Sequence, residues 1–353
     1  MMRLIQRINE LAQIGATPEG ICRTAGSSAD KAGKSMVVQW MLDAGMSVRR
    51  DGYNNIIGRL GPNFGAPIVT GSHTDTVPTA GKFDGALGVI AAIEAAEALK
   101  DELVNPLEVI IFDDEENTMS GSLGYCAEEP DISAFLELHV EQGPVLDVER
   151  KDIGIVTGIV GQRRTHFSVM GQENHAGTTP MNMRDDALVK AASLITYVND
   201  FANEMYDGLV ATVGEISVSP NSFSVIPGQV DLTLQVRDLD VDNMEQFVEK
   251  VSKEFELRYD IVHSSEPALC DPVMQQVMEE VADELGLTSV QMPSRASHDA
   301  QNFTWCPMGM IFVPSINGVS HSPEEETTDE MCYNGCKVLT ETIRRIDGKE
   351  WAF

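Results

Sequence analysis

Four short apolar runs in this sequence are each followed by residues that can bind a metal ion. These are residues 68–72 followed by His73 and Asp75, 109–112 followed by Asp113, Asp114, Glu115 and Glu116, 135–138 followed by His139 and Glu141, and 310–314 followed, after a glycine-containing loop, by His321. Ligands of open α/β sheets collect outside the carboxyl ends of the strands, so we expect these groups to converge. Imidazole nitrogens and carboxylate oxygens suit Zn²⁺, Mn²⁺ or similar divalent ions.

Taken singly, these residues have ordinary alternatives. A lone histidine beside a strand, such as His139, is commonly a hydrogen-bonded core residue, and an acidic run such as residues 113–116 is commonly a solvated face. However, four acids directly after a buried strand are costly unless a cation or water compensates them. Asp84, in a Phe-Asp-Gly sequence, stands at the start of a predicted helix, where the dipole favours negative charge; a plain N-cap is the alternative.

Together the residues predict a site for two metal ions. The predicted ligands are His73, Asp84, Glu116, His139 and His321. A carboxylate shared by two divalent ions would let them polarise a carbonyl and activate water, with Glu115 left free to carry the proton. Asp75 is expected to accept the remaining N–H of His73 and so fix its tautomer. Zn²⁺ or Mn²⁺ is expected, with Co²⁺ or Ni²⁺ also compatible with this ligand set.

The elements that must position these groups are those of an α/β fold. Strands are expected at residues 55–59, 67–70, 107–112, 135–140 and 310–314, with helices at 35–44 and 84–100. The middle of the chain differs, because residues 165–170 and 230–236 alternate as half-exposed antiparallel strands do, around a helix at 185–203. We therefore expect an α/β domain interrupted by a smaller inserted α+β domain.

Composition limits the class of protein. The 353 residues are enough for two domains, and 55 acidic against 25 basic residues give a net charge of -30. That charge disfavours nucleic-acid and membrane-surface partners. The first residues lack the apolar core of a signal peptide, and the six scattered cysteines are typical of reduced cytoplasmic thiols. Cys332 and Cys336 could form half of a metal site, but packing is the simpler interpretation.

Several longer segments resemble one enzyme family. They are RINELAQIG, GSHTDTVPTAGKFDGALGVIAAIEA, DDEEN, FLELHVEQGPVLD, GQENHAGTTPMNMRDDAL and GMIFVPSINGVSHSPEE. Together they resemble the hydantoinase/carbamoylase family of binuclear metal amidohydrolases, which includes N-carbamoyl-L-amino acid hydrolases and allantoate amidohydrolases. This family lies within the aminoacylase-like metallopeptidase superfamily. The resemblance extends over nearly the whole chain.

The resemblance implies a role for each matching residue. His73 and His321 are metal ligands, Asp84 bridges both ions, and Glu116 and His139 complete the two shells. Glu115 is implied to be the general base, and His175 the lid histidine that reaches the partner subunit's site and steadies the oxyanion. The residues implied to hold the substrate are Gln142, Ser224, Arg237 and His298, and Arg237 suits a bidentate grip on a carboxylate. The implied architecture is a mixed-sheet catalytic domain, residues 1–162 and 276–353, with an inserted lid and dimerisation domain, residues 163–275, through which a homodimer forms.

Simpler interpretations of these last residues stay open. Arg237 could form a surface ion pair, His298 and Asp299 could cap a helix, and His175 could be a turn residue. The chain also departs from the family pattern at two places. Ser224 stands where an asparagine is usual and lacks the paired donor and acceptor of an amide, and the segment 117–138 is short.

The sequence therefore predicts a cytoplasmic, homodimeric, metal-dependent hydrolase of a linear amide C–N bond. The expected substrate is an N-carbamoyl-L-amino acid, which gives an amino acid, CO₂ and ammonia. The alternatives are allantoate or another ureide, or a peptide or N-acyl amino acid. A catalytically silent binding protein and a zinc-storage protein are rivals from other classes. No nucleic-acid or membrane partner is expected.

Overall fold

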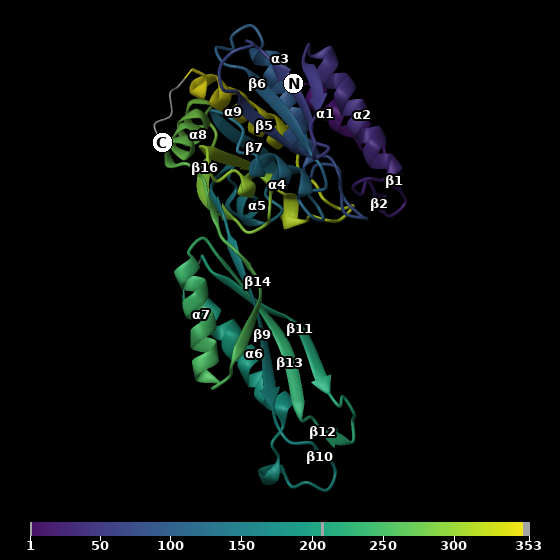
Figure 1. Cartoon of the computed structure of the whole chain (residues 1–353), viewed down its shortest axis with the longest axis vertical. Coiled ribbons are helices and arrows are strands. Elements are labelled where there is room, and N and C mark those ends of the chain that lie inside the picture. Colours follow the sequence, from purple (N-terminus) through teal and green to yellow (C-terminus); the bar gives the residue numbers. More distant parts are fainter. Residues whose placement is uncertain (1, 206–207, 349–353) are drawn as a thin grey trace. The chain divides into compact units, whose positions relative to one another are not determined.

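The structure, a computed structural model, describes residues 2–205 and 208–348 of the chain (Figure 1). The chain forms two compact units. The first consists of Met1–Ile159 and Ala268–Phe353, and the second of Val160–Pro267. The second unit is thus an insertion into the first, and each has a hydrophobic core of its own.

The first unit is built on a mixed β-sheet with the strand order β15-β8-β17-β7-β5-β6-β4-β3, to which β16 adds by pairing with β8. The strands are β3 (Ser47–Arg50), β4 (Ile56–Leu60), β5 (Ile68–His73), β6 (Leu107–Phe112), β7 (Ala134–Val140), β8 (Ile153–Ile159), β15 (Ala268–Leu269), β16 (Ser289–Ser294) and β17 (Met308–Val313). A short pair, β1 (Ala16–Thr17) and β2 (Gly20–Ile21), lies outside this sheet. Strands β5, β6, β7 and β17 run parallel, so their carboxyl ends meet at one edge.

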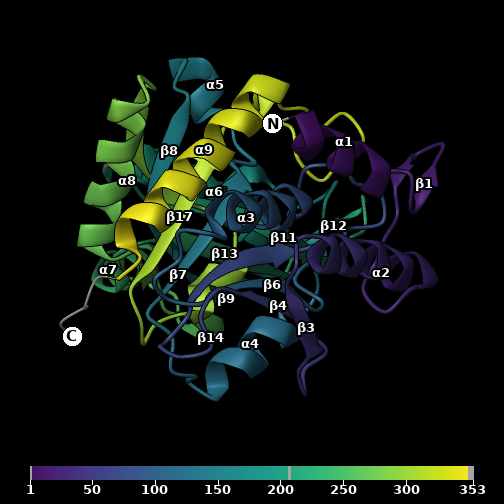
Figure 2. The same ribbon diagram turned by 90° about the horizontal axis from the view of Figure 1, so that it is seen from above.

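Helices cover both faces of this sheet because its strands are apolar on both sides. Along β6, Val109 and Ile111 join one core cluster, whereas Ile110 and Phe112 join the other. The first cluster is covered by α1 (Met2–Leu11), α2 (Ser28–Asp43), α3 (Ala86–Leu99), α8 (Pro272–Glu284) and α9 (Asp329–Ile346), of which α3 and α9 lie side by side (Figure 2). The second is covered by α4 (Ser120–Ala127), α5 (Val145–Glu149) and the 3₁₀ turn η2 (Asp299–Asn302).

The second unit is an antiparallel sheet with two helices on one face (Figure 1). Its strand order is β11 (Val210–Ser219), β13 (Gln229–Asp238), β9 (Gly161–Met170) and β14 (Tyr259–Ser265). Alternate residues of β13, from Val230 to Val236, pack against α6 (Ala187–Met205) and α7 (Val241–Glu254). A short ladder, β10 (Asn174–His175) with β12 (Val225–Ile226), and the 3₁₀ turn η1 (Met181–Met183) complete this unit.

The predicted mixed α/β fold is confirmed, and the expected strands occur where the apolar runs stand. The largest extension beyond the expected bounds is that of helix α2, which begins at Ser28 and not near residue 35. Ser27 caps it by accepting the main-chain N–H of Asp30 at 3.0 Å, so a polar first turn that carries no apolar period is helical nonetheless. No helix in the described residues is long and apolar enough to cross a membrane. The cysteines are free, and Cys332 is buried in the core while Cys336 packs against it.

Candidate metal centre

The parallel strands deliver the predicted ligands to one edge of the first unit. His73 is the last residue of β5, His139 lies near the end of β7, and Glu116 follows β6. Along β7, His139 alternates with Leu138 and Val140, which face the opposite core, so its imidazole points toward the face covered by α4 and η2. His321 comes from the loop between β17 and α9, and Asp84 from the loop before α3.

Asp84 lies at the centre of the cluster. Its Oδ1 is 3.5 Å from Nε2 of His73 and 3.1 Å from Nε2 of His139. Its other oxygen, Oδ2, is 3.3 Å from Nε2 of His321, and Oε2 of Glu116 lies 3.5 Å from the same nitrogen. The five predicted ligands thus form two triads that share Asp84, one with His73 and His139 and one with Glu116 and His321.

The donor set fits divalent cations on electrostatic grounds. Burial raises the pKa of Glu115 well above its usual range, and the nearby carboxylates of Asp299, Glu116 and Asp84 act in the same direction, against the opposing effect of His73. Burial likewise raises the pKa of Glu116. Hydrogen bonds from His139, His321 and His73 outweigh the strong opposing effect of burial and hold the pKa of Asp84 well below its usual range. The site therefore gathers more carboxylates than its imidazoles can neutralise, which is the condition that a bound cation relieves.

Gly85 allows the close approach of the Asp84 loop to His73. It has a φ of +62°, and a Cβ built on it would lie 2.5 Å from atoms of the His73 ring. A larger residue would push the imidazole away from Asp84, so the Phe-Asp-Gly sequence has a steric reason at its third position.

The acidic run after β6 divides into two pairs with different surroundings. Asp113 forms an ion pair with the buried ammonium of Lys34, and Asp114 accepts a hydrogen bond from Thr118. Glu115 points into the site, with Oε2 3.5 Å from Nε2 of His73 and only 8% of its side chain exposed. The run is therefore not a solvated face, and Glu115 stands beside both triads without belonging to either.

Comparison with known proteins decides the family. Residues 69–345 match the family described as Peptidase family M20/M25/M40. The chain is 35% identical to an N-carbamoyl-L-amino acid amidohydrolase of Geobacillus stearothermophilus, with 98% of both chains covered, and 33% identical to an allantoate amidohydrolase of Bacillus subtilis, with 96% of both covered. The protein belongs to the M20 family. The crystal structure of a hydantoinase/carbamoylase family amidase from Burkholderia multivorans superposes with a TM-score of 0.89 at 33% identity, covering 99% of this chain and 98% of that one. The predicted membership in the hydantoinase/carbamoylase group, and with it the prediction of an amidohydrolase, is confirmed.

The carboxylate of Asp75 does not make the hydrogen bond to His73 that the sequence predicts. Nδ1 of His73 lies 3.0 Å from the main-chain oxygen of Asp75 but 3.7 Å from its carboxylate Oδ1. The hydrogen bond that fixes the tautomer is therefore made to the backbone and not to the carboxylate. The carboxylate of Asp75 instead accepts the main-chain N–H of Glu116 at 3.3 Å and ties the β6 loop to the β5 loop.

Two predicted substrate residues lie within this cluster. Gln142 donates through Nε2 to Oδ2 of Asp84 at 2.8 Å, and the same nitrogen is 3.3 Å from Nε2 of His321. The buried ring of His298 lies edge-on to that of His139, with 4.5 Å between centroids. His298 stands at the N-cap position of η2, but its side chain makes no capping hydrogen bond there. Its Nε2 instead contacts Oγ of Ser294 at 2.9 Å.

The other predicted residues belong to the inserted unit. His175 lies on β10, and Ala176 donates its main-chain N–H to the carbonyl of Ser224 at 2.9 Å, which makes His175 and Ser224 neighbours. Nδ1 of His175 accepts the main-chain N–H groups of Gly177 and Thr178, at 2.9 and 3.2 Å. A ring nitrogen that accepts two such bonds carries no hydrogen, so the hydrogen of a neutral His175 is on Nε2.

Arg237 stands on β13, in register with Gln162 of β9 and Val210 of β11. Its Nη2 donates to the amide oxygen of Gln235 at 3.3 Å. Burial lowers the pKa of this guanidinium, and the nearby Arg164 acts in the same direction.

Sequence reasoning missed two buried glutamates of the first unit. Glu137 accepts hydrogen bonds from Oγ of Ser72 at 2.7 Å and from the main-chain N–H of Ala300 at 2.9 Å. It lies two residues before His139 on the same strand face, and that alternation was a signal that could have found it. Glu325, one of three successive glutamates, is buried beside the Asp84 loop, and no local pattern distinguishes it from its neighbours.

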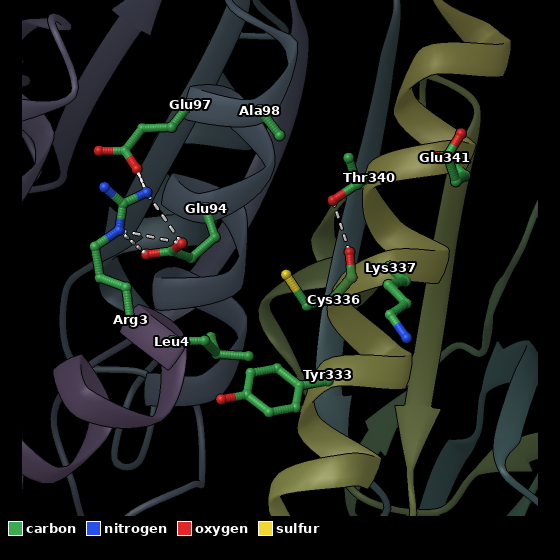
Figure 3. Close-up of a pocket in the computed structure, with 10 residues that line it drawn as sticks. All are labelled: Arg3, Leu4, Glu94, Glu97, Ala98, Tyr333, Cys336, Lys337, Thr340 and Glu341. Carbon is green, nitrogen blue, oxygen red and sulfur yellow. Dashed lines mark hydrogen bonds and ion pairs between the residues drawn. The ribbon is translucent and has the colours of Figure 1, made fainter. Parts of the chain in front are cut away.

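A separate cavity of about 340 Å³ lies between α1, α3 and α9 (Figure 3). Its lining residues are Arg3, Leu4, Glu94, Glu97, Ala98, Tyr333, Cys336, Lys337, Thr340 and Glu341. None of them is a predicted site residue, and Arg3 already pairs with Glu94 and Glu97. The chemistry of the chain is therefore assigned to the cluster around Asp84 and not to this cavity.

Proposed function

We propose that the protein hydrolyses the carbamoyl C–N bond of an N-carbamoyl-L-amino acid with the help of two divalent cations. The observation that carries the proposal is the shared carboxylate of Asp84, whose two oxygens face different imidazoles beside the uncommitted Glu115. We assign one cation to His73, Asp84 and His139 and the other to Asp84, Glu116 and His321. Zn²⁺ or Mn²⁺ suits these donors, as do Co²⁺ and Ni²⁺.

When bound, the cations polarise the substrate carbonyl and lower the pKa of the attacking water. Glu115 accepts a proton from that water and returns it to the departing nitrogen. Cleavage of the bond to the α-nitrogen releases the amino acid and carbamic acid, which decomposes to CO₂ and ammonia.

The remaining roles fall to side chains that orient the substrate. His175 can donate from Nε2 to the developing oxyanion, because its Nδ1 is already occupied as an acceptor. Gln142 and His298 adjoin the ligands, and we assign substrate contacts to both, together with Ser224 and Arg237 of the inserted unit. The guanidinium of Arg237 suits the substrate carboxylate.

We propose further that the inserted unit, Val160–Pro267, is the lid and dimerisation domain expected for residues 163–275, while the first unit is catalytic. Strand β11 is an edge strand, and Ile216 on it is 51% exposed. Val189 on α6, which packs beside β11, is 63% exposed. An edge strand next to exposed apolar side chains supports a homodimer through this unit. Free cysteines suit a reducing cytoplasm.

A Glu115→Gln variant tests the mechanism. We expect it to bind the cations normally and to lose roughly 10²–10⁴-fold in kcat, because the amide cannot accept the proton. Asp114→Asn is the matched control, since Asp114 belongs to the same acidic run and asparagine tolerates its φ of +59°. Full turnover by a metal-loaded Glu115→Gln variant would rule out the mechanism.

The substrate is tested by ammonia release from a panel of compounds under one set of conditions. The panel contains N-carbamoyl-L- and D-amino acids, allantoate, ureidoglycolate, dipeptides and N-acetyl amino acids, the last two with amine detection. The proposal requires the highest kcat/KM on an N-carbamoyl-L-amino acid. A higher value on allantoate, the substrate class named for the Bacillus subtilis relative, would move the assignment to ureide hydrolysis.

A further inference from the structure

The loop between β17 and α9 carries three successive glutamates with different surroundings. Glu324 and Glu326 are exposed, whereas Glu325 between them is only 6% exposed. The same loop carries the metal-facing His321, four residues earlier. A carboxylate is buried only where it has a partner or a function, so Glu325 has a role that its neighbours do not share.

Glu325 is bound to the main chain of the Asp84 loop. Its Oε1 accepts the main-chain N–H of Phe83 at 2.8 Å and that of Asp84 at 3.2 Å. Gly81 leaves the space for this approach, because a Cβ on Gly81 would lie 2.4 Å from Cβ of Glu325. One side chain therefore joins the segment that carries His321 to the residue that both triads share.

The position of the His321 imidazole depends on the conformation of its loop, whereas His73 and His139 are held by the strands that carry them. His73 and His139 are buried at strand ends, and Nδ1 of each contacts a main-chain oxygen, that of Asp75 at 3.0 Å and that of Val140 at 2.9 Å. The side chain of His321 is 50% exposed, its φ is +52°, and the contacts described above are all made by Nε2. The position of this imidazole is thus set by where the loop is fastened.

We propose that Glu325 is a positioning residue that holds His321 and Asp84 at metal-binding distance. It thereby sets the affinity of the Asp84–Glu116–His321 triad for its cation, with a smaller effect on the triad of His73, Asp84 and His139. Asp84 also remains tied to helix α3, where Leu87 donates its main-chain N–H to Phe83 at 2.9 Å, so loss of the Glu325 contact affects His321 more than Asp84. The inference rests on the proposed two-cation function.

Two substitutions separate the effect of the side-chain length of Glu325 from the effect of its charge. Glu325→Gln keeps an acceptor oxygen at the same distance but removes the charge, whereas Glu325→Asp keeps the charge on a side chain one methylene shorter. If the two hydrogen bonds are what matters, the Gln variant binds both cations with affinities within about threefold of wild type. The Asp variant weakens one of the two sites by about 10–100-fold, the loss typical of residues that orient metal ligands. Glu324→Asp and Glu326→Asp are matched controls in the same loop and leave both affinities unchanged.

The experiment is a calorimetric titration of each metal-free protein with Mn²⁺ and with Zn²⁺, together with bound-metal counting after dialysis. Circular dichroism of the metal-free variants checks that each is folded. Wild-type affinity at both sites in Glu325→Asp overturns the inference, as does an equal loss at both sites or a loss in Glu325→Gln that matches the loss in Glu325→Asp. A wild-type protein that binds fewer than two cations overturns the proposed two-cation centre itself, a result that does not involve the variants and that removes the basis of the inference as well.

Discussion

The carboxylate of Asp84 approaches the imidazole of His139 to 3.1 Å, measured between Oδ1 and Nε2. Its other oxygen lies 3.3 Å from Nε2 of His321. Asp84 therefore contributes one carboxylate oxygen to each triad, and without it each triad lacks one of its three donors.

Replacement of Asp84 by asparagine is expected to remove both cations. The amide keeps one acceptor oxygen, but its N–H₂ group takes the place of the second oxygen. An N–H₂ group donates hydrogen bonds and offers no lone pair to a cation, so one of the two sites loses a ligand and the charge of the bridge is lost from both. We expect metal counting after dialysis to give less than one ion per chain, and turnover to fall by more than about 10²-fold, the upper end for changes outside the ligand set. Asp101→Asn, on an exposed loop, is the control; an Asp84→Asn variant that keeps two ions would contradict the bridging assignment.

Gly85→Ala is expected to damage both stability and metal affinity. The new Cβ would stand 2.5 Å from the His73 ring, and the residue has a φ of +62°. Strain and overpacking together cost about 2–5 kcal/mol of unfolding free energy. Gly214→Ala is the control, since a Cβ there meets nothing within 4 Å. Chemical denaturation gives the unfolding free energy of both variants. Equal values for the two would show that a Cβ at position 85 does not destabilise the fold.

Much of the ligand cluster could be predicted from the sequence because the ends of the buried strands are marked by a change from apolar to polar residues. The apolar run of β6 stops at Phe112 and the acids begin at the next residue, and the same change from apolar to polar occurs at His73 of β5. Parallel pairing of these strands then brings the following residues together, so a one-dimensional pattern becomes a three-dimensional site.

The features of the site that could not be predicted from the sequence depend on contacts between distant segments. The partner of Nδ1 of His73 is a main-chain carbonyl, which has no residue type to recognise, and the carboxylate of Asp75 was expected there instead. Glu325 resembles Glu324 and Glu326 in every local respect, and only the fold brings it to the N–H of Phe83. The start of α2 was missed because its first turns are polar, and the N-cap Ser27, not an apolar period, marks it.

The metal-free protein is expected to lose stability as the pH rises. Burial, and then the charge of Asp84, raise the pKa of Glu325 from 4.5 to about 7. A group whose pKa is higher in the folded than in the unfolded state stabilises the fold fully below its unfolded pKa, and that contribution disappears as the pH passes through the folded value. Glu325 alone would contribute up to about 3 kcal/mol that is lost between roughly pH 5 and pH 8. Glu115 and Glu116 act with the same sign, whereas the lowered pKa of Asp84 matters only in acid.

Urea denaturation in the presence of a chelator, at a series of pH values, measures this dependence. Glu325→Gln should flatten the slope, because the amide does not titrate, while Glu324→Gln should leave it as in wild type. Added divalent cation should restore stability at pH 8 in the wild-type protein, since it binds the carboxylate forms. If the unfolding free energy of the metal-free protein rose with pH, the sign assigned to the Glu325 contribution would be wrong.

Finally, the net charge of -30 predicts that salt stabilises this protein. Repulsion among unpaired acidic side chains opposes the compact state, and it is screened as the Debye length falls from about 30 Å at 0.01 M to about 3 Å at 1 M salt. A gain of about 2 kcal/mol over this range would raise Tm by roughly 3 °C, because the unfolding entropy grows with the length of the chain. Calorimetry in KCl and in NaCl should give the same rise, because screening depends on ionic strength. Replacing the exposed Glu19, Asp101 and Glu149 by lysine makes the net charge less negative and should reduce the rise. An unchanged or falling Tm in the wild-type protein would mean that its acidic groups are already compensated within the fold.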